Sequence, residues 1–149
     1  MDTTVMGLLN EQAPDAIIFA GTDGVIREWN AEAEAMFGHT REEAVGQSLD
    51  LIIPEEFRKA HWAGFDRALA DGETKYKGRA MPTRSVRKDG STFYVELSFA
   101  IVLDAAGTVL GALAHGRDIS ERWANDREQR RRLRELEAQL GQASQQSTT

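Results

Sequence analysis

The feature that most constrains this sequence is residues 92–103, where apolar and polar side chains alternate with a period of two. The apolar positions are Phe93, Val95, Leu97, Phe99 and Ile101, and the positions between them include Tyr94, Glu96 and Ser98. Because successive side chains of a strand point to opposite faces, the pattern predicts a strand with one buried face. Asp89-Gly90 predicts a turn that joins it to a preceding strand at 76–86, and a last strand is expected at 109–116.

The first half of the chain predicts a second hairpin followed by helices. Strands are expected at 15–20 and 25–29, joined by Thr22-Asp23-Gly24. Asn30 is placed to cap a helix that ends at Gly38, Thr40 begins a short helix, and Pro54 opens a longer helix to about Ala70. Two hairpins with helices only between them predict an α+β fold, in which one antiparallel sheet carries helices on one face.

Composition divides the chain into four segments. Residues 1–13 contain a short apolar patch that suits a helical cap, and 14–119 hold the mixed strand and helix signals of a single domain. Residues 120–143 are helical and highly charged. Residues 144–149 form a polar stretch with nothing to bury, which predicts a disordered tail.

Composition also excludes several kinds of site. The chain has no cysteine, which rules out disulfides, thiolate metal sites and photochemistry that bonds a flavin to a cysteine. A net charge of −6 argues against nucleic acid as a partner, and no apolar run approaches the roughly 20 residues that cross a bilayer. We therefore expect neither nucleic acid nor a membrane as a partner, and a cytoplasmic location.

Several short motifs resemble those of PAS domains, in order and with ordinary spacing, over roughly residues 10–121. They are Ala-Pro-Asp-Ala-Ile-Ile at 13–18, Trp29-Asn30, Met36-Phe37-Gly38, Leu51-Ile52-Ile53-Pro54, Arg87-Lys88-Asp89-Gly90 and Gly116-Arg117-Asp118-Ile119. The resemblance implies a five-stranded antiparallel sheet in the order 2-1-5-4-3, which cradles a ligand pocket under the helices. PAS domains share a fold but bind different ligands, so the ligand has to be inferred from the residues of the site.

His61 is the candidate ligand-binding residue, because it lies on the Pro54 helix between Phe57 and Phe65. A lone helical histidine is most often structural. However, its distance of 28 residues from Asp89 is similar to that of the proximal histidine in haem-binding PAS domains of oxygen-sensing nitrogen-fixation kinases and oxygen-sensor phosphodiesterases. The resemblance implies haem b with His61 as its iron ligand, and Arg67 as the partner of a haem propionate.

The sequence leaves two candidates, Arg79 and Met81, for the residue on the other side of the haem. Those families place Met 18 residues after the histidine or Arg 20 residues after it, whereas this sequence has Arg79 and Met81, the two types exchanged. If both lie in one strand, both face the pocket. Met81 is then a candidate second iron ligand, and Arg79 a candidate donor to a bound gas.

Small and apolar residues complete the predicted pocket. Leu97 and Phe99 would form an apolar wall, and Ala112 and Ala114 would leave room on the last strand. By parity His115 should point away from the pocket, and His39, in a turn after Gly38, is expected to be solvated.

We expect the C-terminal helix to transmit the signal. Leu133, Leu136, Leu140 and Ala143 recur at heptad spacing, which predicts a weak coiled coil and, with the N-terminal cap, a parallel homodimer. The cluster of arginines at 127–134 is interpreted as a solvated face balanced by glutamates.

No catalytic motif is visible, so we predict a sensor of oxygen, another diatomic gas or redox state, and not an enzyme. Its downstream signalling partner is unknown. The alternatives are a PAS module that binds a small organic ligand or a flavin, or one that serves only dimerisation.

Overall fold

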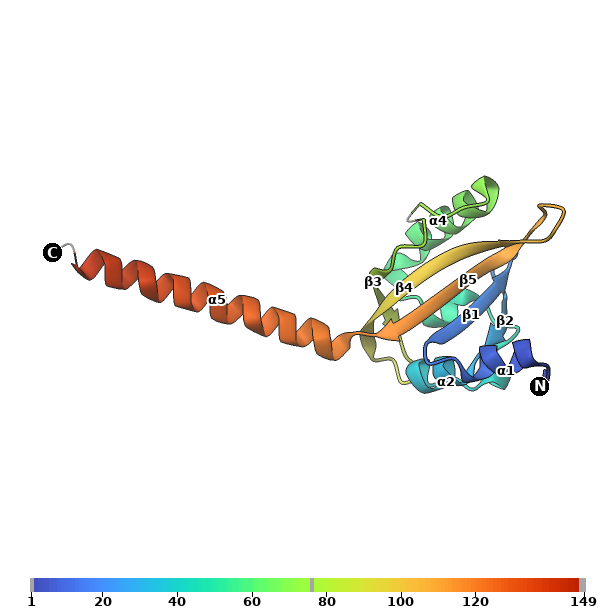
Figure 1. Cartoon of the computed structure of the whole chain (residues 1–149), viewed down its shortest axis with the longest axis horizontal. Helices are drawn as coiled ribbons and strands as arrows, with labels where there is room; N and C mark the ends of the chain where they lie inside the picture. The colour runs from blue at the N-terminus through green and yellow to red at the C-terminus, as the bar shows by residue number, and fades with distance from the viewer. Residues whose placement is uncertain (1, 76, 148–149) are drawn as a thin grey trace. The chain divides into compact units, whose positions relative to one another are not determined.

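The structure, a computed structural model, describes residues 2–75 and 77–147. Residues 1–118 and 119–149 form two compact units. The first unit is built on a five-stranded antiparallel sheet in the order β2-β1-β5-β4-β3, which confirms the predicted fold class and strand order (Figure 1). Its strands are β1 (Ala16–Gly21), β2 (Ile26–Trp29), β3 (Met81–Val86), β4 (Thr92–Leu103) and β5 (Val109–Asp118).

Helices precede the sheet and fill the long connection between β2 and β3. They are α1 (Val5–Gln12), α2 (Ala31–Phe37), α3 (Arg41–Ala44), the 3₁₀ turns η1 (Leu49–Ile52) and η2 (Glu55–Phe57), and α4 (Arg58–Asp71). Buried side chains of α2, α3, η1 and α4 join Ile18, Val95 and Leu97 in one apolar cluster. These helices therefore cover a single face of the sheet.

Capping interactions explain where the first helices begin and end. The Asn30 side chain accepts a hydrogen bond from the Ala33 amide at the start of α2, and Gly38 ends that helix in a left-handed conformation with φ of 85°. Thr40 and Glu43 form a reciprocal capping box around α3. These boundaries follow from the sequence as predicted.

In the first unit, three predicted boundaries differ from the structure by two residues or more. The strand expected at 76–86 begins only at Met81, because Lys77 and Gly78 have φ of 50° and 80°, which is incompatible with a strand; residue 76 lies outside the described part. The Pro54 helix begins as the η2 turn, and regular α-helix starts at Arg58. β5 continues two residues further than predicted, to Asp118.

The second unit is one helix, α5 (Ser120–Ser147). The helix extends past the predicted end at 143, so residues 144–147 of the predicted disordered tail are helical, because serine and glutamine tolerate helix well enough to continue it. Residues 148–149 of that tail lie outside the described part.

Candidate functional site

Helix α4 carries the candidate ligand residue and is mostly exposed. Of its 14 residues only Phe65 is buried. Gly72 ends the helix in a left-handed conformation with φ of 71°, which fixes the chain direction toward β3. Much of this helix is therefore held by a few side chains at its inner edge.

His61 is half-buried on that inner edge, among aromatic rings. Its ring centroid lies 4.8 Å from that of Trp62, edge-on at 79°, and 6.0 Å from that of Phe65. The Nδ1 atom of His61 is buried and has no hydrogen-bond partner. Since buried polar atoms almost always have a partner, this nitrogen is an exception within the part of the chain that the structure describes.

The surroundings favour the neutral imidazole. Burial lowers the pKa of the His61 ring, and the nearby Asp50 carboxylate only partly opposes this by raising it. Neutral imidazole has a free lone pair, which is the form that coordinates a metal ion. The chemistry available to His61 is therefore that of a metal ligand or of a hydrogen-bonding partner for a bound molecule.

The sheet places the other predicted pocket residues on one face. Met81 pairs with Leu97, and Phe99 pairs with Ala114 across the β3-β4-β5 ladder. Leu97 is buried, Met81 is half-buried, and Phe99, Ala112 and Ala114 pack against the core cluster. The predicted wall residues thus lie on the face that the helices cover.

The two arginines are not brought into this group. Arg67 is exposed on α4, and Arg79 is exposed in the irregular segment before β3. The expectation that Arg79 and Met81 share a strand is wrong, because the strand begins at Met81. Parity therefore gives Arg79 no fixed direction toward the pocket face.

The remaining histidines lie elsewhere. His115 is exposed and pairs with Ile17 and Ser98, on the face opposite to Ala114, as its parity predicts. The expectation that His39 is solvated is wrong: it is 9% exposed, because the turn after α2 folds back over Trp29, whose Nε1 donates to the His39 carbonyl at 3.0 Å. Burial accordingly lowers the pKa of His39.

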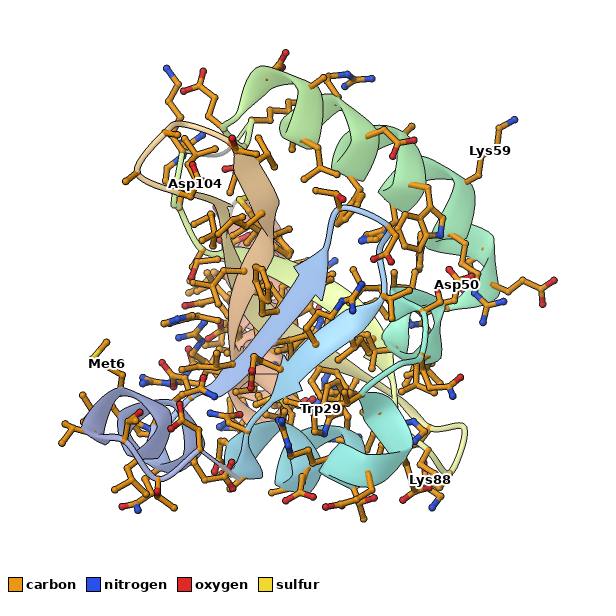
Figure 2. All side chains as sticks on the ribbon, turned by 90° about the vertical axis from the view of Figure 1, so that its right-hand side faces the viewer. Met6, Trp29, Asp50, Lys59, Lys88 and Asp104 are labelled. Carbon is orange, nitrogen blue, oxygen red and sulfur yellow. The ribbon has the colours of Figure 1, made fainter. Side chains whose placement is uncertain are left out.

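Sequence reasoning missed one part of this site, the contact between Trp62 and Asp50. The Trp62 Nε1 donates a hydrogen bond to the Asp50 carboxylate at 2.8 Å, and Figure 2 shows Asp50 close to α4. The two residues belong to different elements, so no helical or strand period links them. The only available signal was an indole next to the candidate histidine.

The end of β5 is tied to the hairpin that joins β3 and β4. Arg87 donates to the Asp118 carboxylate at 2.9 Å and to the Met36 carbonyl at 3.2 Å, and its guanidinium lies 3.8 Å from the centroid of the Phe93 ring. The last residue of the sheet is therefore linked to both α2 and β4.

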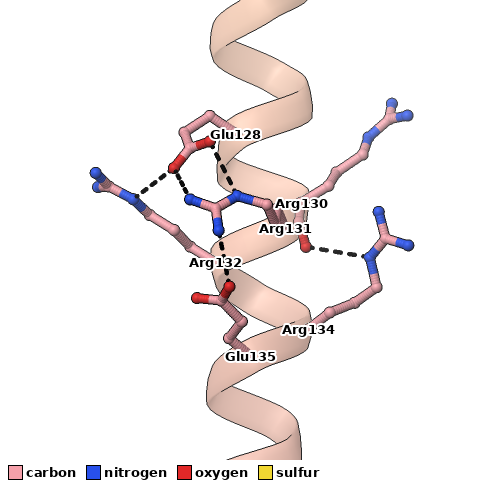
Figure 3. Close-up of polar contacts among 6 residues, drawn as sticks. All are labelled: Glu128, Arg130, Arg131, Arg132, Arg134 and Glu135. Atoms are coloured by element: carbon pink, nitrogen blue, oxygen red, sulfur yellow. Dashed lines mark hydrogen bonds and ion pairs between the residues drawn. The ribbon is translucent and has the colours of Figure 1, made fainter.

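Helix α5 carries a ladder of ion pairs along its own surface (Figure 3). Arg131 pairs with Glu128 and with Glu135, and Arg132 lies 3.4 Å from Glu128. Three leucines, Leu133, Leu136 and Leu140, are each more than half exposed. Pairs at this spacing stabilise the helix modestly, and they leave the leucines as its main unpartnered apolar surface.

The described residues contain neither a multi-residue metal cluster nor a helix that could span a membrane. No cluster of three or more His, Cys, Asp or Glu side chains within 2–75 and 77–147 is placed to hold a metal ion. Within the same ranges, no helix combines the length and the apolar character needed to cross a bilayer. The predicted cytoplasmic location stays a prediction.

A family model described as "PAS fold" matches residues 10–124. Among curated relatives, an uncharacterized protein of Azorhizobium caulinodans is 41% identical over 109 residues, which cover 72% of this chain and 15% of the relative. The sensor protein FixL of Bradyrhizobium diazoefficiens is 28% identical, over 85% of this chain and 24% of the relative. The oxygen sensor protein DosP of Escherichia coli is 30% identical, over 84% and 15%. The chain thus spans less than a quarter of the length of each relative.

Solved structures are similar in fold. A PAS domain from Colwellia psychrerythraea has a TM-score of 0.68 at 22% identity, over 78% of this chain and 95% of that one. An RNA-binding light-oxygen-voltage receptor has a TM-score of 0.69 at 22% identity, over 90% and 37%. At these identities the likeness concerns the fold alone.

Proposed function

The chain belongs to the PAS-fold family, and from that premise we propose that it is a signal-transduction sensor module that binds haem b through His61. It responds to oxygen, another diatomic gas or a change of redox state. Haem would supply an iron that takes a gas ligand or changes oxidation state.

The observation that carries this proposal is the buried, unpartnered Nδ1 of His61. Burial lowers the pKa of the ring, which favours its neutral form, and the ring packs against Trp62 and Phe65. A neutral imidazole in apolar surroundings fits a single-histidine iron site, in which one ring nitrogen would bind the iron. The spacing from His61 to Asp89, similar to that in haem-binding PAS domains, supports the same assignment.

The pocket face supplies the apolar surroundings that a flat cofactor needs. Leu97 and Phe99 would contact it from β4, while Ala112 and Ala114 would leave space on β5. Of the two candidates opposite His61, Met81 is favoured as the second iron ligand, because it is half-buried on this face.

The two arginines take outer positions in this proposal. Arg67 is exposed on α4, which suits a residue that pairs with a propionate at the solvent edge. Arg79 would have to turn inward from the segment before β3 in order to donate to a bound gas.

Output would pass from the sheet to helix α5 in a homodimer. Val5, Met6 and Leu9 of α1 are each more than 60% exposed, and α5 exposes its heptad leucines, so both elements have apolar surface that a second copy could cover. The Arg87–Asp118 pair ties the last residue of β5 to the β3-β4 hairpin. The downstream protein is unidentified, and we assign no catalytic role to this chain.

Titration of the purified chain with haemin tests the proposal. We expect the wild-type chain and the His115→Ala control to bind with a sharp Soret band, and His61→Ala to bind at least tenfold more weakly. Equal binding by all three proteins would contradict the assignment of His61.

A second candidate is a PAS module that binds a small organic ligand or a flavin, or that serves only dimerisation. The exposure of Arg79, in the irregular segment before β3, favours it, because this guanidinium is not held where it would donate to a bound gas. Native mass spectrometry of the purified chain separates these candidates. A bound organic molecule increases the measured mass by its own mass, whereas a module that serves only dimerisation shows the mass of the protein alone.

A further inference from the structure

Two side chains of α4, Trp62 and Arg58, donate hydrogen bonds to Asp50 of the 3₁₀ turn η1, and the bond from Arg58, to the Asp50 carbonyl at 3.4 Å, is the longer of the two. Trp62 Nε1 donates to Asp50 Oδ1 at 2.8 Å, although the two residues are twelve positions apart. Arg58, in the first turn of α4, places its Nε 3.9 Å from the same carboxylate oxygen and donates to the Ile53 carbonyl at 3.1 Å. The Asp50 carboxylate therefore faces two successive turns of the helix.

The same indole also contacts the turn between β1 and β2. A Cβ atom added to Gly24 would lie 2.4 Å from two carbons of the Trp62 ring, closer than real side chains approach. Gly24 has φ of 77°, so glycine also suits the turn conformation. Trp62 thus joins α4 to both η1 and the β1-β2 hairpin.

On the helix, the indole also contacts the candidate ligand residue. It lies edge-on to His61 and, with centroids 5.1 Å apart, to Phe65. His61 Nδ1 has no hydrogen bond that could fix the ring from the protein side. The direction of the imidazole is therefore set by α4 and by these ring contacts.

We propose that the Asp50–Trp62 hydrogen bond, together with the packing of Trp62 on Gly24, is a latch that positions α4 and with it His61. Asp50 and Trp62 are positioning residues in this account, acting through the helix on the residue that binds the ligand. The part of the inference that concerns ligand affinity rests on the proposed role of His61, whereas the latch itself is a property of the ligand-free chain.

Three substitutions distinguish the contribution of the hydrogen bond from that of the Asp50 charge and from that of the Trp62 packing. Asp50→Asn removes the negative charge and keeps an oxygen that can accept from the indole. Asp50→Ala removes the acceptor, and Trp62→Phe keeps an aromatic ring over Gly24 while removing the donor. Asp66→Asn, at an exposed carboxylate on the same helix, is the matched control.

Hydrogen exchange of the ligand-free full chain, read by mass spectrometry on peptides of α4, tests the latch. We expect Asp50→Ala and Trp62→Phe to speed exchange of α4 amides at least tenfold, and Asp50→Asn and Asp66→Asn to stay within twofold of wild type. Haemin affinity should follow the same order, at least tenfold weaker in the first pair and near wild type in the second.

The outcomes distinguish the two proposals. Unchanged α4 exchange in both Asp50→Ala and Trp62→Phe overturns the latch, whatever the chain binds. Faster exchange with unchanged haemin affinity overturns the positioning of His61. If the exchange pattern is as expected but the wild-type chain takes up no haemin, the latch stands and the haem proposal fails. If Asp50→Ala does not fold, the comparison of Trp62→Phe with Asp50→Asn decides.

Discussion

The two ends of the helical face differ in how completely their buried polar groups are satisfied. At the α2 end, Trp29 is fully buried and donates to the His39 carbonyl, and Asn30 makes hydrogen bonds to four backbone groups. At the α4 end, His61 keeps a buried nitrogen without a partner. Figure 2 shows Trp29 and Asp50 in these two regions, near α2 and α4 respectively.

The polar groups at the α2 end therefore stabilise the fold, whereas the unpaired nitrogen at the α4 end lowers the free energy of unfolding. Completely bonded polar groups define one packing arrangement, whereas an unpaired buried nitrogen lowers stability unless something binds it. Proteins keep such local conflicts mainly where function needs them. The comparison therefore supports α4 as the functional helix and α2 as its structural counterpart, and the following changes test it.

The largest effect is expected from Trp29→Ala. It removes a fully buried indole that packs against Phe37 at a centroid distance of 5.4 Å, so the free energy of unfolding should fall by about 3–5 kcal/mol. Urea denaturation followed by circular dichroism measures the loss. Trp62→Ala, at the half-buried α4 end, should cost distinctly less, and an equal or larger loss there would undo the contrast between the two ends.

Asn30→Ala should have the next largest effect. It removes the cap of α2 and leaves the Ile17 amide and the Asp15 carbonyl without their side-chain partner, so we expect a loss of about 2–3 kcal/mol. Asn30→Ser is the matched control, because a serine hydroxyl can still accept from the Ala33 amide and cap α2. A loss for Asn30→Ala no greater than that for Asn30→Ser would show that the cap contributes little.

At the other end, His61→Leu should stabilise the ligand-free chain. Leucine fills a similar volume without a buried unpaired nitrogen, so the unfolding free energy should rise by about 1 kcal/mol. The same variant should lose haemin binding. Destabilisation of the ligand-free chain would mean that the imidazole serves the fold, as Trp29 does.

The smallest effect is a pH dependence of stability. Burial lowers the pKa of His61 below its ordinary value of 6.5, so the unfolded chain binds a proton more readily than the folded chain at mildly acidic pH. Stability should therefore fall as the pH drops below that value, and level off once the pH is below the lowered pKa.

Denaturation of wild type and His61→Leu between about pH 7.5 and about pH 5 measures the contribution of His61. His39 contributes in the same direction, because burial also lowers its pKa, and it is present in both proteins. The variant should show the shallower dependence. Identical slopes would mean that His61 is as solvated when folded as when unfolded.

Patterns that arise within one element were predictable from the sequence. The alternation at 92–103 gave the bounds of β4, and Asn30, Gly38 and Thr40 gave the ends of α2 and the start of α3. Each depends on neighbours a few residues away, so a period or a cap residue carries the information.

Features that depend on tertiary contact were not predictable. The strand predicted at 76–86 is longer than β3, because nothing about a lysine indicates the left-handed conformation that Lys77 adopts. His39 was expected to be solvated because its burial comes from Trp29, ten residues earlier. The sequence pointed to His61 through its spacing, but the Trp62–Asp50 contact joins two elements and became visible only in the structure.

The most direct test of the central claim is an absorption spectrum of the full chain expressed with a haem precursor, recorded oxidised, after dithionite reduction and after carbon monoxide. The account predicts a Soret band that shifts on reduction and again with carbon monoxide, and that is lost in His61→Ala while the circular dichroism of the fold is retained. A featureless visible spectrum, even after haemin is added, would contradict it and leave a PAS module whose ligand is not haem.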